Sequence, residues 1–124
     1  MNKSEYSLGL ITTIRDKTVA GKIAWQEATQ NSSPVITANP TQNLHAVFRM
    51  ERATPFEATW QRFFLFQDGE ELLQVFNPAV LSGKLAASEF SLKAAEILSD
   101  LFSHIAVEPR VRKLTQTLKE LDQL

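Results

Sequence analysis

The pair Asp68-Gly69 constrains the fold more than any other feature of this sequence. Both central positions of a type I′ turn need positive φ, which Asp tolerates and Gly adopts freely. Apolar side chains recur on both sides of the pair, over residues 57–67 and 70–77. The pair therefore predicts a hairpin of two long antiparallel strands, and Pro78 ends the second strand.

Periodicity predicts the elements that precede this hairpin. Residues 4–20 repeat apolar side chains at helical spacing, Ser4 is the expected N-cap, and Gly21 suits a left-handed residue after the helix. Alternation of apolar and polar residues predicts strands over 22–28 and 43–51. The Asn-, Ser- and Pro-rich stretch 29–42 has the composition of a loop, with a short extended piece at 35–38, and Thr54-Pro55 breaks the strand pattern before the hairpin.

Two amphipathic patterns close the chain. Ser88 is the expected N-cap of the first, and Pro109 is expected to end or kink it because proline lacks an N–H and disfavours helix in the residue before it. A last helix is predicted over 109–123, with Val111, Leu114, Leu118 and Leu121 in one stripe.

The order of these elements predicts an α+β fold. An N-terminal helix, a four-stranded antiparallel meander and two C-terminal helices packed on one sheet face satisfy the pattern. The 124 residues suit a single domain, 1–124, without disulfides or a structural metal.

Composition narrows the classes of function. The chain has no cysteine, which removes thiolate chemistry, Cys-based zinc sites and iron–sulfur ligation. The net charge of −1 argues against nucleic acid or an acidic membrane as partner. The N-terminal residues lack the apolar region of a signal peptide, and no apolar run is long enough to span a bilayer, so a cytoplasmic location is expected.

The motif Gly-Lys-Ile-x-Trp at residues 21–25 closes the first helix and opens a strand. In this it resembles a group of small, uncharacterised bacterial proteins in which the strand leads into an antiparallel meander, an Asp-Gly turn and a C-terminal helix rich in leucine and aromatic residues. Asp68-Gly69 and residues 98–102 fill the last two places. The resemblance implies the same fold and no particular activity.

No catalytic, cofactor-binding or metal-binding residues are predicted. Asp100 and His104 are spaced to meet on one helix face, but a metal needs more ligands and the other histidine, His45, lies on a strand. Glu70 and Glu71 are adjacent and point to opposite faces of a strand, and Ser82-Gly83 lacks the surroundings of a nucleophile elbow. A non-catalytic protein is therefore favoured.

Basic residues form two groups. One group opens the last helix and is a candidate anion contact, with solvation as the alternative; its members are Arg110, Arg112 and Lys113. The other could imitate a platform for single-stranded nucleic acid and comprises Arg49, Arg52 and Arg62 near Phe48 and Trp60.

The main functional hypothesis concerns a surplus apolar face of the predicted sheet. Strict alternation from the Asp-Gly turn places Arg62 and Glu71 on the outer face, where an apolar group is expected to form an interaction surface. Its members are Trp60, Phe64, Phe66, Leu73 and Val75. The alternative is that residues 29–42 or 78–87 fold over this face.

These observations predict a non-catalytic protein-interaction module, with a homodimer or another protein as partner. A small-ligand binder or enzyme with a pocket between sheet and helices, containing His45 or His104, is the alternative. A nucleic-acid binder is the second alternative.

Overall fold

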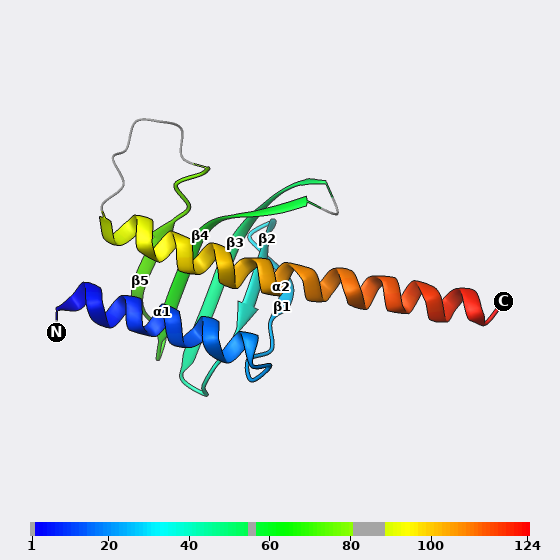
Figure 1. The fold of residues 1–124 in the computed structure, drawn as a ribbon, viewed down its shortest axis with the longest axis horizontal. Helices are drawn as coiled ribbons and strands as arrows, with labels where there is room; N and C mark the ends of the chain where they lie inside the picture. The colour runs from blue at the N-terminus through cyan, green and yellow to red at the C-terminus, as the bar shows by residue number, and fades with distance from the viewer. Residues whose placement is uncertain (1, 55–56, 81–88) are drawn as a thin grey trace.

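A computed structural model gives the fold. It describes residues 2–54, 57–80 and 89–124, with the side chains of 52–54, 57–58, 106–113 and 115 left aside. The elements are α1 (Lys3–Val19), β1 (Gln26–Gln30), β2 (Ser33–Ala38), β3 (Leu44–Thr54), β4 (Glu57–Gln67), β5 (Glu70–Phe76) and α2 (Glu89–Asp122). The five strands form one antiparallel sheet in sequence order, and both helices lie side by side across one of its faces (Figure 1). The predicted α+β class is confirmed.

Helix α1 begins and ends one residue earlier than the predicted range 4–20. Asn2 is the N-cap in place of Ser4, because its side-chain oxygen accepts a hydrogen bond of 2.9 Å from the Glu5 N–H. Gly21 adopts the predicted positive φ of 76°. The N–H groups of Gly21 and Lys22 then bond to the carbonyls of Thr18 and Lys17, which satisfies the helix end in a Schellman motif.

The extended piece predicted at 35–38 is confirmed as part of β2, but the prediction of a loop over 29–42 is wrong for the other residues of this range that β1 and β2 contain, and the sheet therefore has five strands instead of four. Strands β1 and β2 form a hairpin around Asn31 and Ser32, whose φ values are 50° and 65°. Both turn residues thus adopt the conformation of a type I′ turn, which Asn tolerates well and Ser rarely adopts. The first strand also begins at Gln26 and not at Lys22.

The remaining strands follow the prediction closely. Strand β4 spans 57–67 as expected, and Asp68 and Gly69 adopt φ values of 51° and 80° between β4 and β5. Strand β3 continues to Thr54, beyond its predicted end at 51, and Pro55 of the predicted break lies outside the described part of the chain.

Three register shifts interrupt the alternation of the sheet; one lies near the end of β3, where Arg52 pairs with Ala58 and Thr54 with Glu57, and the other two are β-bulges further inside the sheet. Between β3 and β4, Arg49 pairs with Arg62 and Met50 with Trp60, so Gln61 is an extra residue. Between β4 and β5, the register also shifts after the Leu65 pair, and Leu72 is the extra residue. Each bulge reverses the face to which the residues beyond it point.

The core lies between the sheet and the two helices. Phe48 is at its centre, with ring centroids 5.5 Å from Trp25, 5.7 Å from Trp60, 4.8 Å from Phe63 and 5.4 Å from Phe102. Helix α2 supplies Leu98, Leu101, Phe102 and Ile105, and α1 supplies Ile11 and Ile14. The indole N–H of Trp25 donates to the Thr18 hydroxyl at 3.0 Å, which ties the start of the sheet to the end of α1.

The two helical segments predicted around Pro109 are both present, but they join into one helix, α2. A proline inside a helix costs about 3 kcal/mol and removes one backbone hydrogen bond, and this local penalty has not ended the helix here. The expected Ser88 cap lies outside the described residues. Only the first part of α2 covers the sheet, because the C-terminal part extends beyond it (Figure 1). The predicted packing on one sheet face is therefore confirmed for the first C-terminal segment, whereas the second segment lies beyond the sheet.

Candidate functional site

The sheet face opposite the helices carries the first candidate, here called the outer-face site. It consists of Arg49, Arg62, Phe64, Phe66 and Phe76. Each of these residues neighbours a core residue on its own strand, such as Phe48, Phe63 or Val75, and so points away from the helices. Both helices lie on the other face of the sheet (Figure 1).

The predicted interaction surface is divided by the two bulges. Phe64 and Phe66 point outward as expected, but the other three members point inward. Trp60 is 2% exposed, Val75 is 3% exposed, and Leu73 packs against the core. Placing Trp60, Leu73 and Val75 on the outer face is therefore wrong, because strict alternation does not continue across Gln61 and Leu72.

Two arginines lie directly opposite each other in the outer-face site. Arg49 on β3 pairs in register with Arg62 on β4, and neither forms an ion pair with a described carboxylate. The guanidinium carbon of Arg62 lies 4.7 Å from the ring centroid of Phe76, which is a cation–π contact. Without a described carboxylate partner, the two guanidinium groups make the local charge positive. Like charges in directly opposed positions also destabilise a sheet.

A shallow groove of about 270 Å³ adjoins Arg49. Phe64 and Phe66 form one wall, with stacked rings whose centroids are 6.1 Å apart and whose planes differ by 17°. Val35 and Val47 are buried but lie outside the core cluster, and they form the apolar floor. The complete lining is Gln30, Asn31, Ser33, Val35, Val47, Arg49, Phe64 and Phe66. The groove is thus on the outer face, and not between sheet and helices where the small-ligand alternative places its pocket.

His45 borders this site. Its ring centroid is 6.3 Å from that of Phe66, and its Nδ1 lies 2.9 Å from the side-chain oxygen of Asn39. The second histidine, His104, is on the opposite side of the sheet in α2. Among the described residues no group of three or more His, Asp or Glu side chains could hold a metal ion.

The C-terminal part of α2 carries the second candidate, here called the leucine stripe: Leu114, Leu118 and Leu121. These side chains are 67%, 62% and 59% exposed. Their spacing of four and three residues places them on one side of the helix. From Leu114 onward, every residue whose side chain is described is exposed. The stripe was predicted from the sequence, but its exposure was not.

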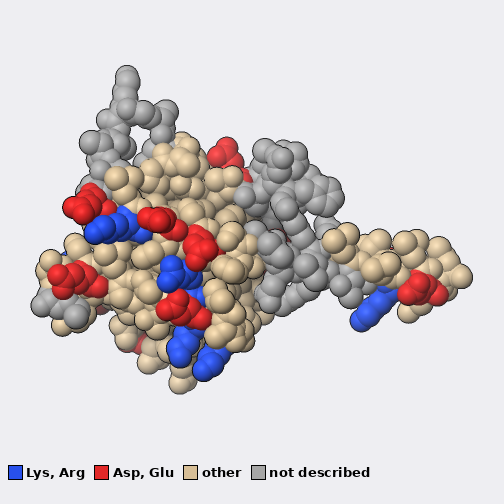
Figure 2. All heavy atoms as spheres, in the orientation of Figure 1, with Lys and Arg blue, Asp and Glu red and all other residues tan. Residues whose placement is uncertain are grey.

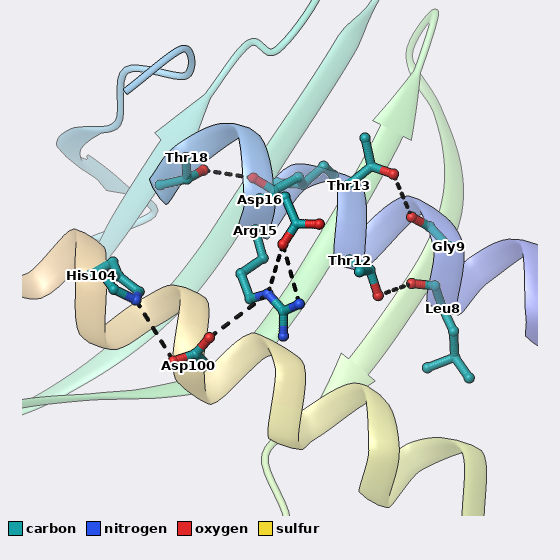
Figure 3. Close-up of polar contacts among 10 residues, drawn as sticks. Leu8, Gly9, Thr12, Thr13, Arg15, Asp16, Thr18, Asp100 and His104 are labelled. Carbon is teal, nitrogen blue, oxygen red and sulfur yellow. Dashed lines mark hydrogen bonds and ion pairs between the residues drawn. The ribbon is translucent and has the colours of Figure 1, made fainter. Parts of the chain in front are cut away.

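Asp100 and His104 belong to a small group of polar contacts between α1 and α2 (Figure 3). His104 Nε2 is 3.7 Å from Asp100 Oδ1, and Asp100 Oδ2 is 3.7 Å from Nε of Arg15, which also contacts Asp16 at 3.2 Å. The Asp100 and His104 side chains are about half exposed, and surface ion pairs of this kind contribute little to stability. This arrangement links α1 to α2.

The other sequence candidates are exposed or lie outside the described part of the chain. Glu70 and Glu71 are both exposed at the start of β5. Ser82-Gly83, and the side chains of Arg110, Arg112, Lys113 and Arg52, lie outside what the structure describes. On the helix side of the molecule, acidic and basic side chains are interspersed, with no large area of one sign among the residues drawn in colour (Figure 2).

Comparison with known proteins finds no match: no family model fits the chain, and neither a curated protein nor a solved structure is significantly similar to it. The resemblance to small bacterial proteins therefore stays a prediction. None of the described helices combines the length and apolar character needed to cross a membrane.

Proposed function

We propose that the chain is a non-catalytic interaction module that pairs with a second copy of itself through the leucine stripe. The observation that carries the proposal is the exposure of three leucines, each about 60% or more, on a helix end that extends past the sheet. Burying leucine side chains contributes about 1.5–3 kcal/mol each when the burial is complete. Pairing of two chains would bury the leucine stripe and so stabilise this end of α2.

The length of α2 supports the same conclusion. Isolated helices shorter than about 12–15 residues are marginal in water, and most helices in proteins are held by packing of an apolar face. The described side chains from Leu114 to Asp122 are all exposed, so the leucine stripe is not buried against the rest of the chain. A second helix along the stripe would bury it, in a contact of the coiled-coil type.

Light scattering on a size-exclusion column tests the proposal. At about 100 µM the wild-type chain should have the mass of a dimer, since mass action favours association at high concentration. Leu118→Glu should shift the mass to that of a monomer, because the variant places a charge in the proposed contact. Circular dichroism of the same variant should show a folded sheet, because Leu118 is distant from the core.

Gln116→Glu provides the matched control. It introduces the same charge into the same helix, but Gln116 lies on the side away from the leucine stripe. This variant should remain dimeric. A wild-type chain that is monomeric at about 100 µM, or two variants with equal effects, would contradict the proposal.

A further inference from the structure

We infer that the outer-face site binds single-stranded nucleic acid, with bases on the phenylalanine rings and a phosphate between Arg49 and Arg62. This site lies on the sheet, whereas the proposed self-association uses the far end of α2. The inference therefore goes beyond the proposed function and does not depend on it.

The opposed arginines are the first argument. Arg49 and Arg62 face each other across β3 and β4 without a described carboxylate partner, although such a pair disfavours the sheet. An anion between them would remove the repulsion and gain charge-assisted hydrogen bonds from two guanidinium groups. Phosphate suits this geometry because guanidinium binds it through two parallel bonds.

The aromatic side chains are the second argument. Phe64, Phe66 and Phe76 stand on the same face as the two arginines, and Phe76 is 40% exposed. Exposed rings beside cations bind single strands because every base has a π-face that can stack. The groove beside Phe64 and Phe66 has the apolar floor that a base needs and a guanidinium at its border.

The arrangement favours a strand over a free nucleotide or a duplex. An aromatic ring lies next to an arginine at two places. One is the groove next to Arg49, and the other is the contact between Arg62 on β4 and Phe76 on β5. One nucleotide could use only one of these places, while consecutive nucleotides of a strand could use both. A duplex keeps its bases stacked inside, so it would leave the phenylalanine rings without a partner.

The charges elsewhere on this face limit the affinity. Glu51 and Glu71 also lie on the outer face, beyond the arginine pair in opposite directions along the strands. The Glu51 carboxylate accepts a hydrogen bond of 3.1 Å from Gln61. With a net charge of −1, the chain offers no long-range attraction, so we expect binding to depend on these local contacts and to be weak at high salt.

Fluorescence anisotropy with a labelled 12-nucleotide oligouridine tests the inference in 50 mM salt. The wild-type chain should bind the strand more tightly than a duplex of equal length and more tightly than uridine monophosphate used as competitor. Phe64→Ala should weaken binding about tenfold, because it removes one base-stacking ring. Arg62→Gln should lower the slope of log affinity against log salt by about 0.7, which corresponds to one phosphate contact.

Arg15→Gln is the matched control. It removes one arginine charge from α1, on the opposite side of the sheet, and should leave strand binding unchanged. Leu118→Glu should also bind the strand normally, which separates this inference from self-association. Backbone amide shifts of the wild-type chain on adding the oligouridine should concentrate on β3, β4 and β5, a readout that needs no variant.

Four results would overturn the inference: no binding at about 100 µM protein, equal affinity for strand and duplex, equal affinity for uridine monophosphate, or equal losses in Arg15→Gln and Arg62→Gln. Conversion of a dimer to a monomer by Phe64→Ala, without strand binding by the wild type, would also overturn it. The outer-face site would then be a contact between proteins.

Discussion

Substituting either of two glycines with open surroundings should change the stability of the protein, but in opposite directions. A Cβ atom added to Gly9 or Gly69 would meet no atom within 4 Å, so only the backbone decides the effect of a substitution. Gly9 is helical, and Gly69 has a φ of 80° in the β4–β5 turn. Gly9→Ala should raise the free energy of unfolding by about 0.5–1 kcal/mol, and Gly69→Ala should lower it by about 1–2 kcal/mol.

Urea unfolding of the two variants measures this difference directly. Both substitutions add one methyl group at an open position, so each is the control for the other. Equal slopes of free energy against urea would show that the denatured state is the same in both. A Gly69→Ala variant as stable as Gly9→Ala would mean that the turn does not require a left-handed residue.

At the scale of elements, Asn77 stabilises the bulge at Gln61. Its side-chain amide donates a hydrogen bond of 2.8 Å to the Trp60 carbonyl, and its backbone N–H donates one of 2.9 Å to the Gln61 carbonyl. Asn77 is 6% exposed, so a carbonyl that loses this partner would have no water to replace it. The bulge consequently depends on a residue beyond the end of β5.

Asn77→Ala should lower the free energy of unfolding by about 2 kcal/mol, because it leaves the buried Trp60 carbonyl unsatisfied. Asn39→Ala is the control, since the hydrogen bond between Asn39 and His45 is exposed and should contribute less than about 0.5 kcal/mol. Thermal or urea unfolding of both variants gives the comparison. Similar stabilities would show that the side chain of Asn77 does not hold the bulge.

The same bulges explain how much of the site could be predicted from the sequence. The hairpin at Asp68-Gly69 was predictable because its turn has a strong local signal. Gln61 and Leu72 carry no such signal, and both faces of β4 are apolar, so periodicity could not show that the alternation reverses. Phe64 and Phe66 lie between the two bulges and were placed correctly, whereas Trp60, Leu73 and Val75 lie beyond them and were not.

The turn at Asn31-Ser32 was missed for a related reason. Its Asn is a good residue for positive φ, but Ser32 is not, and Pro34 follows within β2. The polar composition of residues 29–42 is that of a loop, so the sequence did not indicate a hairpin there. Placing the hairpin required the pairing of β2 with β3, in which Ile36 faces Phe48 in the core, and such long-range pairing is not visible in local sequence.

At the scale of the whole molecule, the proposed dimer has a preferred orientation. By sequence, residues 110–113 carry three cations, while residues 119–122 carry one cation and two acids. A parallel pair would bring the two basic segments together, but an antiparallel pair sets each beside an acidic segment and also opposes the helix dipoles. An antiparallel pair centred on Gln116 places Leu114 of one copy opposite Leu118 of the other.

Disulfide trapping can determine this orientation because the chain has no cysteine of its own. Leu114→Cys and Leu118→Cys, mixed and oxidised, should form mainly the mixed disulfide, since only opposed positions reach the short Cβ distance that the bond needs. Gln116→Cys faces away from the contact and should link poorly. Faster linking of each leucine variant to itself would indicate a parallel pair, and linking of Gln116→Cys at the same rate would show that collisions, not a specific contact, produce the bond.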